Sequence, residues 1–425
     1  MMQYDSAIES DYSSTRAPKT AETFDLSLFF ATILLITCGL ISIYSATYYT
    51  GLGEFFNKQL QYAGVGLVCM VIVAYLPERF LFNLSYIGFV IGLILLGAVL
   101  TPLGKEVYGS RSWIALGTFT FQPAELVKFA TIAAVARYLS QKGTDITTLR
   151  DAGITVLIFG LPIALIMAQP DFGSASVFIA LAVGMALWAG LDIYFLYIIV
   201  TAPLVAVSAF WSQSTFYVTA AVFSAFSLLF RRGIIVTLIG ISVLVGAGYS
   251  SGYVYSIMKP HQKARIQTFL NPDSDPKGRG YNVIQSILAV GSGGFTGKGF
   301  LQGTQTQLRY IPKQWTDFIF CVPTEEFGFI GGVTILFFMG TIIYRCVDTA
   351  TTATSRYGSL LSFGVATMFF YHVVVNVGMA IGWFPVMGIP LPFMSAGGTS
   401  LVINMVMIGA VLNVHRQKAL RRKGV

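Results

Sequence analysis

The chain has 425 residues, of which 11% are charged and 55% are hydrophobic, and its formal net charge is +8. Soluble domains carry about 25% charged residues, so this composition excludes a soluble enzyme, a disordered scaffold and a nucleic-acid-binding domain. The remaining class is a polytopic membrane protein, whose spans must be helical because lipid cannot satisfy an open backbone.

The apolar runs predict an all-α integral membrane protein, a bundle of about 12 transmembrane helices, since about 20 apolar residues cross a bilayer. Residues 1–25 are polar, mixed in charge and without the basic start of a signal peptide, so we expect a disordered tail there. The predicted spans are residues 26–47, 60–76, 80–100, 123–140, 152–168, 174–190, 193–211, 216–230, 234–253, 318–343, 358–380 and 399–414. The four cysteines are scattered, which favours small buried hydrophobic side chains over a disulfide framework or a zinc site.

These spans divide the chain into regions whose Lys and Arg content predicts the orientation. Helices one to nine occupy residues 26–253, a long loop occupies 254–317, helices ten to twelve occupy 318–415, and a basic tail occupies 416–425. Cytoplasmic loops carry an excess of Lys and Arg, and an even number of spans places both termini on one side. We expect both termini in the cytoplasm, because the short loops of the opposite face hold only Lys58, Lys105 and Arg111.

The long loop does not follow this charge pattern. Between Tyr253 and Trp315 it carries eight Lys and Arg residues against Asp273 and Asp275, on the face where positive charge is normally sparse. Two interpretations remain open. Long loops escape the charge rule, or the loop binds an anionic ligand such as a phosphorylated lipid.

Two similar motifs place charges at the outer boundary of apolar helices, where ionisable groups are costly. In FQPAELVK, Glu125 and Lys128 are three residues apart and share a helix face. They form either a structural ion pair or the lining of a wet cavity that supports a reactive group. In QPDFG, Asp171 either caps the next helix or has a functional role.

The loop sequence NPDSDPKGRGYN contains two carboxylates among several cations. Neighbouring cations keep a carboxylate ionised, and an ionised carboxylate can act as a base that accepts the proton of a hydroxyl group. A rigid turn is the alternative. The following Gly-rich stretch, residues 291–299, does not match a nucleotide-binding P-loop, because Gly299 stands where Ser or Thr is required. Its backbone amides could still meet a phosphate.

The segment between the last two spans, residues 385–400, contains too many glycines and prolines for a regular helix. Irregular backbone at this depth is tolerated where it is buried in protein or lines a cavity. His372 and Asn376 lie four apart on the preceding helix and could point toward it, for a structural hydrogen bond or for chemistry.

Together these stretches resemble the SEDS family (shape, elongation, division and sporulation), whose members polymerise peptidoglycan. The similar segments occur in the family's order across most of residues 110–415, and GKGFLQGTQTQLRYIP is similar to the RodA, or rod-elongation, branch rather than FtsW. They are FQPAELVK, QPDFG, NPDSDPKGRGYNVIQSILAVGSGGFTGKG, TDFIFCVPTEEFG and GIPLPFMSAGGTS.

The resemblance implies a multi-pass protein of the bacterial inner (plasma) membrane that is a lipid II glycosyltransferase. It also implies a class B penicillin-binding protein as transpeptidase partner and a place in the elongation machinery, and no nucleic acid is expected. The family's essential loop aspartate matches Asp275, and its cavity pair matches Glu125 and Lys128. Trp113 sits at the family's RW[IV] position, which here reads Ser112-Trp113-Ile114 after Arg111.

The chain also departs from the family's pattern. It has Ala124 where members often have Ser, and Ala396 where they have Tyr. The family usually has ten spans, so the surplus looks like a hairpin inserted at about residues 193–230. A pair of helices leaves the long loop outside, and the functional assignment is unchanged.

As a hypothesis, Asp275 deprotonates the acceptor hydroxyl, which displaces polyprenyl pyrophosphate with inversion, and Asp273 is the alternative base. Loop cations would stabilise the pyrophosphate charge. A divalent cation (Mg²⁺ or Mn²⁺) could assist, although no ligand set is evident. A flippase of the same lipid, and a scaffold that only positions the transpeptidase, are the competing readings. The candidate substrate-binding residues are Arg265, Arg279, Lys128, Glu125, Trp113, Arg111, Asp171 and Ser395.

Overall fold

The computed structural model describes residues 24–50, 53–107, 110–116, 119–257, 263 and 279–422. The predicted disordered tail therefore lies almost wholly outside the described residues, as do the loop aspartates Asp273 and Asp275 and the cation Arg265.

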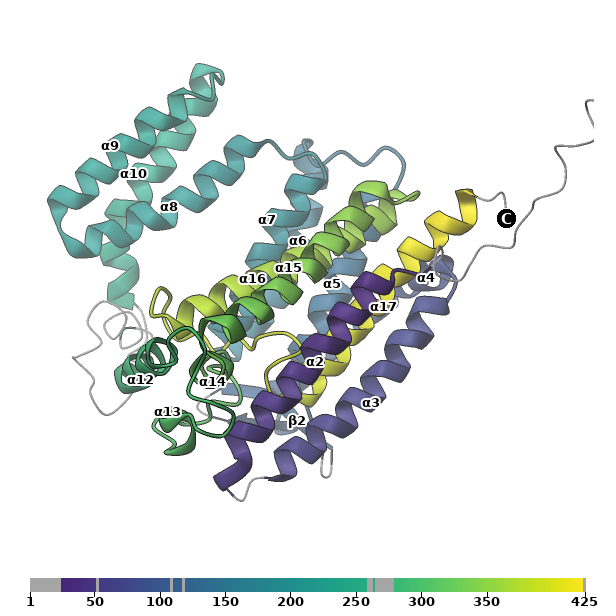
Figure 1. Cartoon of the computed structure of the whole chain (residues 1–425). Coiled ribbons are helices and arrows are strands. Elements are labelled where there is room, and N and C mark those ends of the chain that lie inside the picture. Colours follow the sequence, from purple (N-terminus) through teal and green to yellow (C-terminus); the bar gives the residue numbers. More distant parts are fainter. Residues whose placement is uncertain are drawn as a thin grey trace, which may run out of the picture.

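Each of the twelve predicted spans contains a long helix (Figure 1). Nine of the helices among the described residues are long and apolar enough to cross a membrane, while α5, α7 and α9 have 17, 17 and 16 residues. The protein is a multi-pass helical membrane protein, and the count of twelve spans stays a prediction. The helices are α2 (Leu26–Thr47), α3 (Gly53–Tyr75), α4 (Glu78–Val99), α5 (Pro123–Leu139), α6 (Leu149–Ala168), α7 (Phe172–Trp188), α8 (Ile193–Trp211), α9 (Gln213–Leu228), α10 (Ile234–Ile257), α15 (Gly328–Thr352), α16 (Arg356–Ala380) and α17 (Gly398–Arg422).

Local sequence explains where several of these helices begin. Side-chain oxygens of N-cap residues accept hydrogen bonds from backbone amides that have no partner within the helix. Asp25, Thr148, Asp192 and Ser355 do so for α2, α6, α8 and α16. Pro123 occupies the first turn of α5, where its missing N–H costs nothing.

The expected start of the tenth span, at residue 318, is wrong. Residues 321–326 form a separate short helix, α14 (Cys321–Glu326), and α15 begins at Gly328, which has a φ of +63°. Glycine adopts this left-handed conformation without a steric penalty. An average over hydropathy cannot detect a break of one residue inside an apolar run, so the hydropathy pattern predicts one continuous helix here.

Several shorter elements connect the long helices. A small antiparallel sheet in the order β1-β2-β3 precedes α5, and it was not among the expected elements because its strands are too short for a clear alternating pattern. Part of the long loop is helical. These elements are η1 (Tyr48–Thr50), β1 (Gly104–Val107), β2 (Ser110–Leu116), β3 (Phe119–Phe121), α12 (Arg279–Ser292) and α13 (Thr304–Gln307).

The main core surrounds α5, whose residues 130–136 are all buried. Four of these seven residues are alanines, and small residues let helices approach closely in a membrane. The same principle brings α3 against α17, where a Cβ on Gly66 would lie 2.4 Å from Met405 Sδ. In Figure 1, α8, α9 and α10 stand apart from this bundle.

These three helices have a hydrophobic core of their own, formed by Tyr194, Ile198, Val205, Phe216, Ala220 and Leu244. Leu244 belongs to α10, so this core joins α8 and α9, the expected hairpin at about residues 193–230, to a third helix. The insertion of that hairpin stays a prediction. Its position away from α5 keeps it out of the site described below (Figure 1).

Contacts between helix ends define two opposite ends of the bundle. At one end, Arg345 Nε near the end of α15 lies 2.8 Å from Asp25, which caps the start of α2. At the same end, Asn413 Nδ2 of α17 donates to the Val73 carbonyl of α3 at 3.0 Å. The start of α2 and the end of α17 therefore lie at the same end of the bundle, as an even number of spans requires. We call the other end the outer end.

Candidate functional site

The centre of the candidate site is a buried ion pair in the first turns of α5. Lys128 Nζ lies 2.7 Å from Glu125 Oε1, and the two side chains are 1% and 3% exposed. The spacing of three residues puts both on one helix face. The structure thus confirms the pairing that the sequence indicated.

Glu125 uses only one of its carboxylate oxygens in this pair. Its Oε2 atom is buried and has no hydrogen-bond partner within the described part of the chain. A buried acceptor without a donor costs free energy, so this oxygen is chemically suited to accept a hydrogen bond from a hydroxyl or amide of a bound molecule.

His372 of α16 joins the pair to the irregular segment after α16. Its Nε2 lies 3.5 Å from Lys128 Nζ and its Nδ1 lies 2.9 Å from the Pro390 carbonyl oxygen. An ammonium only donates and a carbonyl only accepts, so Nε2 is the acceptor and Nδ1 carries the proton. The same segment is held by Asn376, whose Nδ2 donates to the Asp317 and Ile389 carbonyls at 2.8 Å. Both residues therefore make structural hydrogen bonds.

Ser395 is part of this segment and holds its fold. The Ser395 hydroxyl donates to the Thr316 carbonyl at 2.7 Å and accepts from the Leu391 amide at 2.8 Å. The amide group of Gln59, at the start of α3, contacts the Ser395 carbonyl at 3.2 Å and the Gly397 N–H at 3.1 Å. Because its one proton is already donated within the protein, the Ser395 hydroxyl has no donor left for a substrate.

Asp171 is the N-cap of α7, as one of its two readings predicted. Its Oδ1 accepts from the Ser174 amide at 3.0 Å and its Oδ2 accepts from the Ser174 hydroxyl at 2.8 Å. Gly173, two residues later in the same motif, packs on the segment after α16. A Cβ on Gly173 would lie 2.3 Å from the Met387 carbonyl oxygen. The same Cβ would lie 3.4 Å from Ile389 Cγ1, so the QPDFG and GIPLPFMSAGGTS motifs, far apart in sequence, are in contact.

Arg111 and Trp113 lie on either side of a β-bulge in β2, where Arg111 pairs with Glu106 and Trp113 pairs with Lys105 of β1. Arg111 is exposed and Trp113 is half-buried. The sheet is attached next to the ion pair, because β3 leads directly into α5 and the Thr399 hydroxyl of α17 donates to the Thr120 carbonyl at 3.3 Å. These two residues therefore belong to the same end of the bundle as Glu125.

The cationic loop reaches this end through α12. Arg279 begins α12, and its side chain lies outside the described residues. The helix is anchored by the Ser286 hydroxyl, which donates to the Ala380 carbonyl at the end of α16 at 2.9 Å. The helix α12 is thereby fixed at the outer end of α16, two turns beyond His372.

Glu325 is a buried acid that the sequence reading did not single out. Its side chain is 0% exposed, and it lies 2.7 Å from Lys298 Nζ. It also accepts hydrogen bonds from the Gln305 amide, the Thr306 amide and the Thr306 hydroxyl at 2.7–2.9 Å. Burial raises the pKa of Glu325, but the hydrogen bonds from these groups outweigh it and hold the pKa below its ordinary value. The adjacent Glu326 differs, because burial raises its pKa.

The Gly-rich stretch packs on this acidic helix instead of presenting free amides. The Lys298 and Gly299 amides donate to the Glu325 and Glu326 carbonyls at 3.1 and 2.9 Å, and a Cβ on Gly297 would lie 2.1 Å from the Glu326 carbonyl oxygen. The expectation that amides of this stretch could meet a phosphate is therefore wrong for residues 298 and 299. The glycines are needed for close backbone contact.

We expect Glu325→Gln to lower the free energy of unfolding by about 1.5–3 kcal/mol at neutral pH, the range for hydrogen bonds to a charged group. Because the folded-state pKa lies below the ordinary value of 4.5, the carboxylate stabilises the protein above that pH, and this stability is lost as the pH falls through the folded-state pKa. Thermal unfolding of wild type and variant between pH 7 and 3 measures the effect.

The control for this experiment is Glu54→Gln, because the Glu54 side chain is 82% exposed in its pair with Lys58. Such a pair contributes at most about 1 kcal/mol. If the difference in the free energy of unfolding between wild type and Glu325→Gln does not shrink toward acid pH, the assigned role of the carboxylate is contradicted.

No group of three or more His, Cys, Asp or Glu side chains that could hold a metal ion occurs among the described residues. Asp273 and Asp275 lie outside that part of the chain.

Comparisons with known proteins cover almost the whole chain. A family model described as "Cell cycle protein", for FtsW, RodA and SpoVE, matches residues 26–223 and 214–420. Stage V sporulation protein E of Bacillus subtilis (strain 168) is 35% identical over 400 residues, which cover 92% of this chain and 97% of that protein. Peptidoglycan glycosyltransferase RodA of Treponema pallidum (strain Nichols) is 34% identical over 435 residues, which cover 93% of this chain and 98% of that protein.

A solved structure agrees with these matches. It is described as "Structural coordination of polymerization and crosslinking by a peptidoglycan synthase complex", and one of its chains aligns with a TM-score of 0.71 at 29% identity. The alignment covers 93% of this chain and 98% of that chain.

Proposed function

The chain belongs to the FtsW/RodA/SpoVE family, and from this premise we propose that it is a peptidoglycan glycosyltransferase of the RodA-like branch. It polymerises lipid II into β-1,4-linked glycan strands during cell-wall elongation. The observation that carries this proposal is the similarity, over 93% of the chain, to a protein named peptidoglycan glycosyltransferase RodA.

The buried Glu125–Lys128 pair supports an active role for the outer end. An ionisable group inside the membrane is costly and normally faces a substrate path or a wet cavity. Here the pair is held by His372 and retains one unpartnered carboxylate oxygen. The unpartnered Oε2 atom supports a role for Glu125 in accepting a hydrogen bond from the sugar or peptide of the donor chain.

In the proposed mechanism, Asp275 accepts the proton of the acceptor hydroxyl, whose oxygen forms the new bond to the anomeric carbon of the donor. The bond from that carbon to polyprenyl pyrophosphate breaks, and the leaving group takes the electron pair. Arg265 and Arg279 stabilise the developing pyrophosphate charge. An α-linked donor and a β-1,4 product require inversion, so no enzyme nucleophile takes part.

The orientation of the protein follows from the same proposal. Lipid-linked substrate is polymerised outside the cytoplasm, so the outer end faces outward and both termini are cytoplasmic, in the bacterial plasma membrane. The partner is a class B penicillin-binding protein within the elongation machinery. The similar chain in a peptidoglycan synthase complex supports such a partner.

The test is polymerisation of purified lipid II by the detergent-solubilised protein, with and without the transpeptidase partner. Glycan ladders on a gel are the expected result, and an arm with EDTA reads out any need for a divalent cation. A well-folded complex that makes no ladders, yet moves labelled lipid II between the leaflets of vesicles, would replace the proposal by a flippase of the same lipid.

A further inference from the structure

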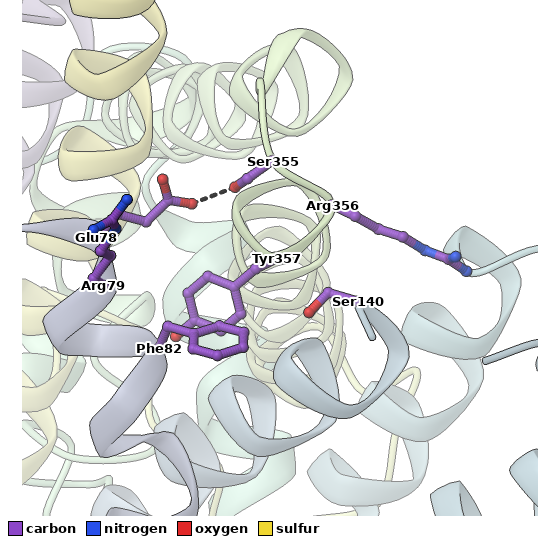
Figure 2. A pocket seen from close by; sticks show the side chains of 7 residues that line it. All are labelled: Glu78, Arg79, Phe82, Ser140, Ser355, Arg356 and Tyr357. Carbon is purple, nitrogen blue, oxygen red and sulfur yellow. Dashed lines mark hydrogen bonds between the residues drawn. The ribbon is translucent and has the colours of Figure 1, made fainter. Parts of the chain in front are cut away.

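Figure 2 shows a hollow of about 260 Å³ from close by. It lies at the end of the bundle opposite the Glu125–Lys128 pair. It is formed where α4 begins, α5 ends and α16 begins. Ser140 lies 15 residues after Glu125 along α5, or about 22 Å at 1.5 Å per residue, so this hollow is separate from the candidate active site. Its lining residues are Glu78, Arg79, Phe82, Ser140, Ser355, Arg356 and Tyr357.

The walls of the hollow are held rigidly. The Phe82 and Tyr357 rings meet edge to face at 5.2 Å, and the Tyr357 hydroxyl is hydrogen-bonded to Ser85 at 3.0 Å. Arg137 lies beneath, with its guanidinium 4.6 Å from the Phe82 ring and its Nη1 donating to the Phe82 carbonyl at 2.9 Å. These contacts hold the aromatic rings that form one wall of the hollow.

Charges of both signs surround it. The Glu78 carboxylate accepts a hydrogen bond from the Ser355 hydroxyl through Oε1 only (Figure 2). Figure 2 shows Arg79 on the Glu78 side and Arg356 on the other side, extending away from the hollow. Both arginines are exposed, and neither forms an ion pair within the described chain. They are long side chains that retain the freedom to turn onto a ligand.

The location suits a lipid headgroup. Three helices start or stop at the hollow, which places it at a membrane boundary, and basic pockets between membrane helices at such boundaries bind phospholipid headgroups. Guanidinium groups match the geometry of phosphate oxygens. The Glu78 carboxylate would repel a headgroup that is purely anionic, whereas an ammonium would be attracted both to it and to the neighbouring aromatic rings.

We propose that this hollow binds the headgroup of an aminophospholipid. The phosphodiester lies between Arg79 and Arg356, and the primary ammonium lies on Glu78. The site binds a lipid of the leaflet at this end of the bundle and is independent of the polymerisation chemistry at the other end.

Native mass spectrometry of the full-length protein in detergent, titrated with phosphatidylethanolamine or phosphatidylglycerol, tests the proposal. We expect Arg79→Gln and Arg356→Gln each to weaken binding of both lipids roughly fivefold, because that is the factor in affinity that one cation contributes near a lipid phosphate. We expect Glu78→Gln to weaken the binding of phosphatidylethanolamine by a similar factor and to strengthen the binding of phosphatidylglycerol. Glutamine can still accept the Ser355 hydrogen bond, so the fold should persist, which thermal unfolding checks.

Arg150→Gln is the matched control, because Arg150 is an exposed arginine at the same end of the bundle outside the hollow. It should leave the affinity for both lipids unchanged. If Glu78→Gln strengthens the binding of both lipids, the site binds anionic headgroups, and the placement of the ammonium on Glu78 is overturned. If the arginine variants bind like the Arg150 control, the hollow is no headgroup site.

Discussion

Asp275→Asn is expected to abolish the polymerisation of lipid II, with a loss of at least about a hundredfold in the rate of glycan synthesis. A general base contributes about 10²- to 10⁴-fold, and the amide of Asn cannot accept the proton of the acceptor hydroxyl. Asn has the size of Asp, so binding of the transpeptidase partner should persist. The rate is measured from glycan ladders made by the purified complex.

Asp273→Asn is the matched control, since Asp273 lies two residues away in the same cationic loop. It should retain most of the activity. If Asp273→Asn loses activity and Asp275→Asn keeps it, the base is Asp273. If both variants polymerise normally, the enzyme uses neither carboxylate as its base.

Lys128→Met is expected to lower the free energy of unfolding by about 3–5 kcal/mol. The substitution removes one partner of a buried ion pair and leaves Glu125 as an uncompensated buried charge, which is strongly destabilising. A double variant, Glu125→Gln with Lys128→Met, removes both charges and should recover most of the stability. Thermal unfolding in detergent measures both variants.

The pair Glu54–Lys58 provides the control, because its atoms are 3.2 Å apart but its side chains are 82% and 57% exposed. Lys58→Met should cost less than about 1 kcal/mol. Equal losses for Lys128→Met and Lys58→Met would show that the α5 pair is solvated. The polymerisation assay separates the two roles of the pair: if the stable double variant remains fully active, Glu125 and Lys128 are structural only.

Much of the helical architecture and the central ion pair could be predicted from the sequence. Apolar runs predict the helices because the bilayer imposes their length, and α8 begins and ends at the predicted residues 193 and 211. Glu125 and Lys128 are paired by helical spacing alone. Asp171 caps α7 through Ser174, three residues later. All of these relations involve neighbours within one turn of a helix or one continuous run.

The contacts that assemble the outer end could not be predicted in this way. The pairing of Lys128 with His372 spans 244 residues, and the clamp of Gln59 on Ser395 spans 336. Likewise, nothing local to Glu325 indicates that Lys298 and Thr306 donate to it. Helix packing determines which of the many polar groups come into contact. The periodicity within a single segment carries no information about such contacts.

Composition, apolar runs and short motifs are local properties, and they suffice to predict a polytopic helical membrane protein, the Glu125–Lys128 pair and the family to which the chain belongs. Three features follow only from tertiary packing: α14 and α15 are separate helices, α8, α9 and α10 form a unit with its own core, and the Gly-rich stretch packs on α14. Those outcomes depend on close approach between segments distant in sequence. At such contacts a single glycine or buried carboxylate selects one packing from many that have the same hydropathy.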